Sequence, residues 1–148
     1  MTTLQHRIET RAAPAALWAV LAELTSVGRT NPGVAEVALL PGPDAGPGAR
    51  RACRLKPKGR VVERVTHWTE GSVIGFEVVE SDWPLSAMRW ETRVSARPGG
   101  AVLSQTLDYR PGFGPFGWLM DRLMMRRMIG RAVEAALRGA VAEAEGRR

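Results

Sequence analysis

The sequence predicts an α+β fold in which a seven-stranded antiparallel sheet packs against one long C-terminal helix. Two patterns carry this prediction. Residues 34–110 alternate apolar and polar side chains, which is the period of strands, and the turns between these segments are short, which favours antiparallel neighbours. Residues 114–145 are rich in helix formers and contain no proline after Pro115, so they predict one helix of about 30 residues. A single helix covers one face of such a sheet, and we expect the other face to meet water.

Seven segments have the period and the flanking turns of strands. They cover residues 4–11, 34–40, 49–56, 60–69, 72–80, 86–96 and 101–110. Between the first two strands, residues 14–24 predict a helix, because proline is favoured in the first turn and apolar side chains recur on one side. Its apolar residues are Leu17, Trp18, Val20, Leu21 and Leu24. A second short helical turn precedes residues 31–33, and residues 1–148 are expected to form one domain.

The predicted C-terminal helix changes character along its length. Its second half has one apolar face, formed by Ile129, Val133, Ala136, Leu137, Ala140, Val141 and Ala144. In its first half, Met120, Met124 and Met128 add a second apolar stripe beside the core side. A helix that is apolar on two sides must be covered twice or must border something apolar that is not protein. The alternatives are further core, a homodimer contact, or one wall of a ligand cavity.

The formal net charge is +6, and arginine supplies almost all of the basic residues. These arginines are spread over the strands and the last helix without interleaved aromatic residues, so no nucleic-acid partner is expected. A single cysteine, Cys53, excludes a disulfide framework and a cysteine metal cluster. Residues 2–11 have no long apolar run, and no segment reaches the length of a membrane span. We therefore expect no signal peptide, no stable membrane insertion and a cytoplasmic location.

Motifs of cofactor binding and of the common catalytic classes are missing from the sequence. Gly112, Gly114 and Gly117 lack the spacing that cradles a phosphate, and they follow a strand that is predicted to be antiparallel. The GxSxG, HExxH and CxxC motifs do not occur. A metal site would require His6 and His67 to converge with Cys53 and carboxylates. No cofactor and no metal are therefore expected.

A mostly apolar pocket is predicted between the sheet and the long helix. In residues 86–96 the side that contains Met88 and Trp90 must face inward, because the opposite side carries arginine and glutamate. The glycine-rich residues 111–117 are expected to form the mouth, with Gln105 and Tyr109 as the polar groups that orient a ligand. The predicted ligand-binding residues are Phe76, Met88, Trp90, Gln105, Tyr109, Phe116, Leu119, Met120 and Leu123.

For the strand at residues 60–69, the sequence does not decide which face points inward, because both faces mix apolar and polar residues. If Glu63 and His67 point inward, they would serve as acid and base, with Gln105 and Tyr109 orienting a substrate carbonyl. If the other face points inward, Glu63 and His67 are solvated surface residues. These four residues are catalytic candidates only under the first alternative.

Several short passages carry a family resemblance. They are residues 13–18 (APAALW) with Leu21, 31–34 (NPGV), 65–68 (VTHW), 99–103 (GGAVL) and the Gly- and Pro-rich entry to the last helix. With the order strand, two short helices, six strands and long helix, they resemble the helix-grip fold over nearly the whole chain. Within the SRPBCC superfamily, which includes the START-like lipid-binding proteins, the chain most resembles bacterial polyketide cyclase/dehydrase-type proteins. The resemblance implies a curved sheet wrapped round the helix and an apolar cavity.

Members of that superfamily bind or transform lipids, polyketides, hormones and other hydrophobic molecules, and the passages quoted indicate the fold but no particular reaction. Three functions follow as hypotheses. The favoured one is binding of a small hydrophobic, lipid- or polyketide-like ligand without chemistry. The second is a cyclase, aromatase or dehydratase that uses the same cavity, which leaves open whether the protein is an enzyme. The third is a protein–protein interaction module that uses the methionine-rich helix.

Overall fold

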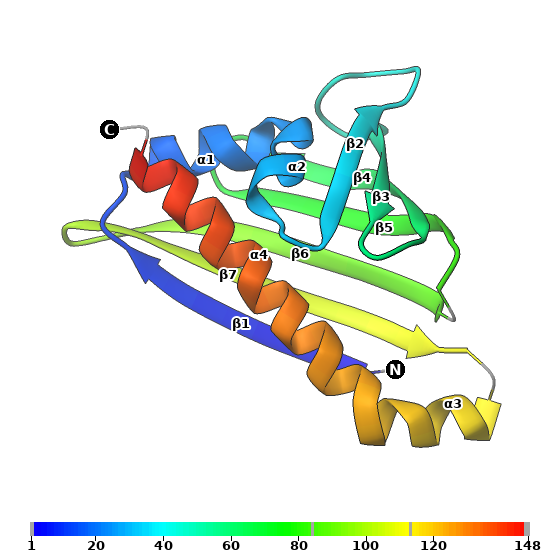
Figure 1. Ribbon diagram of the computed structural model, residues 1–148. Coiled ribbons are helices and arrows are strands. Elements are labelled where there is room, and N and C mark those ends of the chain that lie inside the picture. The colour runs from blue at the N-terminus through cyan, green and yellow to red at the C-terminus, as the bar shows by residue number, and fades with distance from the viewer. Residues whose placement is uncertain (1, 84, 113, 147–148) are drawn as a thin grey trace.

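The computed structural model describes residues 2–83, 85–112 and 114–146, and it has the predicted α+β architecture (Figure 1). Seven strands form one sheet in the order β1-β7-β6-β5-β4-β3-β2, and every pair of neighbours is antiparallel. The strand boundaries differ from the predicted ones by one or two residues at most. The strands are β1 Thr2–Thr10, β2 Val34–Leu39, β3 Arg50–Leu55, β4 Arg60–Thr69, β5 Val73–Ser81, β6 Leu85–Arg97 and β7 Gly100–Pro111.

Strands β1 and β2 are consecutive in sequence but lie at opposite edges of the sheet. Two short helices connect them. Helix α1 spans Pro14–Ala22, a 3₁₀ turn spans Leu24–Ser26 and α2 spans Val27–Thr30. Proline starts α1, as the sequence predicts, because its missing N–H costs nothing in the first turn. The buried side of α1 consists of Leu17, Trp18 and Val20.

The C-terminal helix is continuous but bent, whereas the sequence predicted an uninterrupted helix. Helix α3 spans Gly114–Met120, a π-helical turn spans Asp121–Met125 and α4 spans Arg126–Gly146. In Figure 1, α3 projects beyond the end of β7 and changes direction before α4 crosses the sheet. The extra residue of a π turn shifts the side chains that follow it. At this turn Asp121 points into the protein and accepts hydrogen bonds from Tyr109 and from Thr2.

The core lies between the inner face of the sheet and the helices α1 and α4. It includes Leu103 and Leu107 of β7, Leu17 of α1, and Leu137 of α4, all of them at most 5% exposed. Further along the sheet, towards β3 and β4, α4 and the strands do not fill the space between them, and a cavity remains. Within the described residues, no helix combines the length and the apolar character needed to cross a membrane.

Candidate functional site

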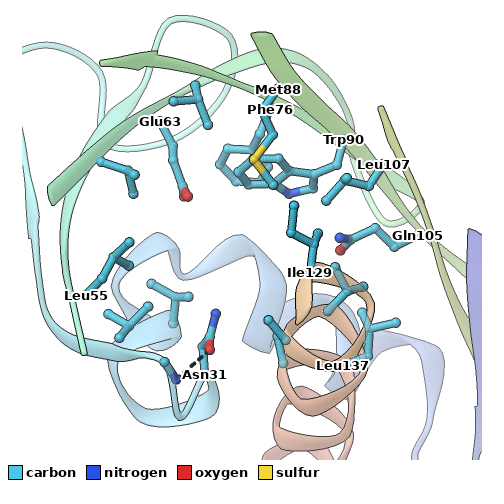
Figure 2. A pocket seen from close by; sticks show the side chains of 18 of the residues that line it. Asn31, Leu55, Glu63, Phe76, Met88, Trp90, Gln105, Leu107, Ile129 and Leu137 are labelled. Atoms are coloured by element: carbon cyan, nitrogen blue, oxygen red, sulfur yellow. Dashed lines mark hydrogen bonds between the residues drawn. The ribbon is translucent and has the colours of Figure 1, made fainter. Parts of the chain in front are cut away.

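A cavity of about 510 Å³ separates α4 from the strands β3 to β7 (Figure 2). Apolar side chains make up most of its lining. The wall formed by the sheet includes Phe76, Met88, Trp90, Gln105 and Leu107. The wall formed by the C-terminal helix includes Met125, Ile129, Val133, Ala136 and Leu137. The cavity therefore lies between sheet and long helix, where the sequence predicted a pocket.

The mouth of the cavity differs from the predicted one. The solvent-exposed residues of the lining are Gly33, Lys56, Pro57, Met128 and Ala132. They place the opening between the loop after α2, the turn between β3 and β4, and the first turns of α4. Those of residues 111–117 that the structure describes do not line the cavity; Phe113, which belongs to the predicted mouth, lies outside the described residues.

An aromatic pair forms the centre of the sheet wall. Phe76 on β5 and Trp90 on β6 are register partners, and their rings stack with centroids 5.3 Å apart and an interplanar angle of 23°. The guanidinium carbon of Arg51 lies 4.4 Å from the centroid of the Phe76 ring. This geometry gives a flat ligand an aromatic surface, and it holds the arginine by a cation–π contact.

A buried ion pair is the main polar feature of the wall. Arg51 on β3 pairs with Glu63 on β4, with 2.7 Å between Nε and Oε1, and its Nη1 donates to the carbonyl oxygen of Leu24 at 2.9 Å. The two side chains are only 9% and 12% exposed. Figure 2 shows the Glu63 carboxylate pointing into the cavity. Arg51 was not identified as a cavity residue from the sequence. Alternation along β3 could have identified it, because Arg51 shares a strand face with the apolar residues Cys53 and Leu55, and that face points inward.

Cys53 lies close to this ion pair, and its Sγ is 4.0 Å from Glu63 Oε1. Burial, together with the negative charge of Glu63, raises the pKa of the Cys53 thiol to about 12. A thiol in this state stays protonated near neutral pH and is a poor nucleophile. Cys53 is thus a packing residue of the small apolar cluster that it forms with Val34 and Val61, rather than a reactive group.

A second polar pair lies on the neighbouring strands. Thr92 on β6 and Gln105 on β7 are register partners, and the Thr92 hydroxyl donates to Gln105 Oε1 at 3.1 Å. Because the amide oxygen is used in this way, the amide nitrogen of Gln105 remains for other acceptors, and Figure 2 shows the amide turned towards the cavity. The structure therefore brings Phe76, Met88, Trp90 and Gln105 of the predicted set to one wall.

The structure separates the two residues of the predicted acid–base pair. Strand β4 has register irregularities between Val62 and Glu63 and between Val65 and His67. The second irregularity leaves Thr66 without a register partner on β5 and breaks the alternation of faces on β4. Glu63 therefore lines the cavity, while His67 lies on the outer face. His67 is half exposed, and its Nε2 is 2.8 Å from Glu91 Oε2. A proton relay between Glu63 and His67 is therefore excluded by their positions on opposite faces.

Tyr109 also differs from the prediction, because its hydroxyl does not reach the cavity. The residue is fully buried, and its hydroxyl donates to Asp121 in the π-helical turn. Burial and this hydrogen bond raise the pKa of Tyr109 above its ordinary value of 10.0. Tyr109 therefore attaches the start of the C-terminal helix to β7 and is not placed to orient a ligand in the cavity.

The four predicted helix residues lie away from the cavity as well. Phe116, Leu119 and Leu123 are 63%, 47% and 62% exposed, and Met120 is partly exposed. None of these four is part of the described lining. The physical reason is the buried line of the helix, which runs through Gly117, Asp121 and Met125 and turns the remaining apolar side chains outward.

Among the described residues, no group of three or more His, Cys, Asp or Glu side chains is arranged to hold a metal ion. The cavity wall offers one carboxylate, Glu63, and it is already paired with Arg51. The arrangement can therefore hold an apolar molecule, donate a hydrogen bond from Gln105 and accept one at Glu63.

Solved structures with the same fold cover almost the whole chain. A protein from Thermus thermophilus has 16% identity and a TM-score of 0.83, with 98% of each chain covered. An aromatase/cyclase from a Streptomyces species has 19% identity and a TM-score of 0.81, covering 99% of this chain and 94% of its own. A START superfamily protein from Mycobacterium smegmatis has 12% identity and a TM-score of 0.81, with 99% of each chain covered. At these identities the likeness concerns the fold alone.

No curated protein matches this chain with significance. At the level of families the assignment is clear, because one sequence model matches almost from end to end. Residues 1–145 match the family described as polyketide cyclase / dehydrase and lipid transport, and this chain therefore belongs to that family.

Proposed function

We propose that the protein binds a small hydrophobic, lipid- or polyketide-like molecule in the cavity between the sheet and α4. The observation that carries the proposal is the cavity itself, with a volume of about 510 Å³ and a mostly apolar lining. Pockets for small molecules usually enclose roughly 300–1,000 Å³, with a few polar groups in an apolar wall. Family membership supports the same class of ligand.

The polar groups favour a neutral, oxygenated ligand over a fatty acid. The charge of Glu63 is balanced by Arg51, so the pair presents no net charge to a ligand. A carboxylate ligand would therefore gain no net attraction from this pair, while burying its charge in a mostly apolar cavity is costly. A carbonyl oxygen can accept from the Gln105 amide, while a hydroxyl group can donate to Glu63. Molecules with carbonyl and hydroxyl groups on a flat apolar skeleton suit these partners and the ring pair of Phe76 and Trp90.

The test is a binding titration with a hydroxylated anthraquinone and with palmitate, followed by indole fluorescence. Both are expected to bind, the anthraquinone more tightly. Trp83 and Trp90 both line the cavity, so the change in fluorescence should decrease in Trp90→Phe and disappear in Trp83→Phe/Trp90→Phe, which assigns the signal to the cavity. Met88→Trp fills the cavity and is expected to weaken binding at least about tenfold. The control is Val79→Trp, an exposed position outside the main cavity. Equal binding by Met88→Trp and the parent, with circular dichroism unchanged, would reject the proposal.

The second candidate is a cyclase-type enzyme, and one observation favours it. Glu63 is a carboxylate held in place at the wall of an apolar cavity, which is a position from which a general base can act. Incubation with a poly-β-ketone analogue should then give a ring-closed product of lower mass by one water for each dehydration. Glu63→Gln should abolish turnover and retain binding. Product formation that is unchanged in Glu63→Gln would remove Glu63 from the mechanism.

A further inference from the structure

The first half of the C-terminal helix carries an apolar stripe that points away from the sheet. We call it the outer stripe, and it consists of Phe116, Leu119, Met120, Leu123 and Met124, with Met128 at the edge that it shares with the cavity lining. The first five follow the spacing i, i+3, i+4, i+7 and i+8, which puts them on one side of a helix. Apart from the partly exposed Met120, the members are between 44% and 63% exposed. In Figure 1, α3, which carries the first three of these residues, projects beyond the end of β7.

The surroundings of the outer stripe are strongly basic. Residues 111–131 contain four arginines, Arg122, Arg126, Arg127 and Arg131, all of them exposed, and a single acid, Asp121. Asp121 is buried and accepts hydrogen bonds from Thr2 and Tyr109, so its charge does not face the surface. Arg122 also lies over the exposed ring of Trp118, 5.1 Å from its centroid. Among the described residues, none of these four arginines pairs with an acidic side chain, so the surface combines large apolar side chains with positive charge.

This combination disfavours a second copy of the chain as the occupant. A twofold dimer brings the same patch of both subunits together. Such a contact on the outer stripe would bring the four arginines close to their own symmetry mates, and like charges at a contact are destabilising. The partner must instead be apolar beneath and negatively charged at its surface.

We propose that the outer stripe docks on a membrane surface that contains anionic phospholipid. An interfacial amphipathic helix places its apolar side chains at the boundary between headgroups and acyl chains and its basic residues against anionic headgroups. Phe116, Leu119 and Leu123 supply the apolar contact, because they are exposed on the same side of the helix.

The outer stripe also reaches the mouth of the cavity. Met128 belongs to the stripe and to the cavity lining, and Ala132, one turn further along α4, is an exposed lining residue. Docking would therefore bring the opening close to the bilayer. The docking proposal does not depend on which molecule the cavity holds, because the stripe and its arginines lie outside the cavity apart from Met128.

The apolar contact is tested by flotation with vesicles of phosphatidylglycerol and phosphatidylcholine. The variant Phe116→Ser/Leu123→Ser is expected to bind at least about tenfold more weakly than the parent. The matched control is Leu39→Ser/Val79→Ser, which removes two apolar side chains of 36% and 41% exposure from the strands. The control is expected to bind like the parent. All four positions are exposed, so the folds should be retained, and circular dichroism checks this.

The charge requirement is tested in the same assay. Arg126→Gln/Arg127→Gln should weaken binding about twenty-fivefold, from roughly fivefold for each arginine. The control Arg11→Gln/Arg97→Gln has the same net charge, and both positions adjoin the start of β7, whereas α3 follows the end of that strand. Vesicles of phosphatidylcholine alone should bind weakly.

Four outcomes would overturn the docking proposal. The first is failure of the parent protein to float with the anionic vesicles. The second is equal binding to both kinds of vesicle, and the third is binding that is unchanged in the stripe variant. The fourth is a concentration-dependent dimer that the stripe variant loses, without any vesicle binding, which would assign the surface to a second copy.

Discussion

Arg51 and Glu63 lie opposite each other on β3 and β4, and their side chains form an ion pair in the wall of the cavity with 2.7 Å between Nε and Oε1. Removing one partner of a buried pair leaves the other charge without compensation. Glu63→Gln is therefore expected to lower the free energy of unfolding by about 3 kcal/mol, measured by urea denaturation.

A surface pair on the next strands provides the control. Arg64 and Glu77 also pair across two strands, but their side chains are 48% and 34% exposed. Glu77→Gln should therefore cost less than about 1 kcal/mol. If Glu63→Gln costs no more than Glu77→Gln, the cavity pair is hydrated like a surface pair, and the argument for an apolar cavity is weakened.

We expect the phenol of Tyr109 to titrate at an unusually high pH. This can be measured directly, because the chain contains one tyrosine. Its raised pKa means that the folded state holds the phenolic proton more tightly than the unfolded state does. Tyrosinate absorbance of the native protein should therefore appear well above the pH at which it appears in denaturant, where the pKa is about 10. Asp121→Asn should move the native titration towards the denatured one. Coinciding native and denatured curves would contradict the buried hydrogen bond.

The same linkage sets the direction of an effect on stability. Below the unfolded pKa both states are protonated, and the stabilising contribution of Tyr109 is fully present. As the pH rises above about 10, the unfolded state loses the proton first, and the free energy of unfolding falls. Tyr109→Phe should lower stability at neutral pH by about 1–2 kcal/mol and should flatten the decline at alkaline pH. A decline of equal slope in Tyr109→Phe would assign it to other groups.

Much of the fold could be predicted because the signals for it are local. The alternation of apolar and polar residues and the positions of glycine and proline are sufficient to place seven strands, and Pro14 marks the start of α1 correctly. The bend at residues 121–125 could not be predicted in this way. The bend places Asp121 in buried hydrogen bonds with Thr2 on β1 and Tyr109 on β7. A local sequence pattern does not reveal such contacts between separate elements.

The site was predicted less completely, and β4 shows why. Strict alternation puts Glu63 and His67 on one face, but the register irregularity between Val65 and His67 places them on opposite faces. A bulge cannot be recognised reliably from one sequence. The face on which each residue beyond it lies therefore cannot be predicted by alternation. The prediction that residues of the C-terminal helix line the cavity has a different weakness. Phe116 and Leu123 are apolar, but apolarity alone does not say whether a side chain faces a cavity or the outside.

Two leucines of the C-terminal helix separate its core side from its outer side. Leu137 is 5% exposed and Leu123 is 62% exposed. Leu137→Ala should lower the free energy of unfolding by about 2–4 kcal/mol, because it removes buried methyl groups and leaves a void. Leu123→Ala should change it by at most about 0.5 kcal/mol. Similar losses at both positions in denaturant unfolding would show that the outer stripe is covered in the free protein.

Two alanines of α4 offer a matched test of the cavity from the helix side. Ala136 faces the cavity, whereas Ala142 is exposed and does not line it. In a packed core, a phenylalanine in place of alanine would cost about 1–3 kcal/mol or more through overpacking. In a cavity the ring enters existing space, so Ala136→Phe should leave thermal stability almost unchanged. It should nevertheless weaken binding of the anthraquinone at least about tenfold, while Ala142→Phe binds like the parent. Marked destabilisation by Ala136→Phe would instead mean that this part of the interior is packed, and the binding proposal would lose its main support.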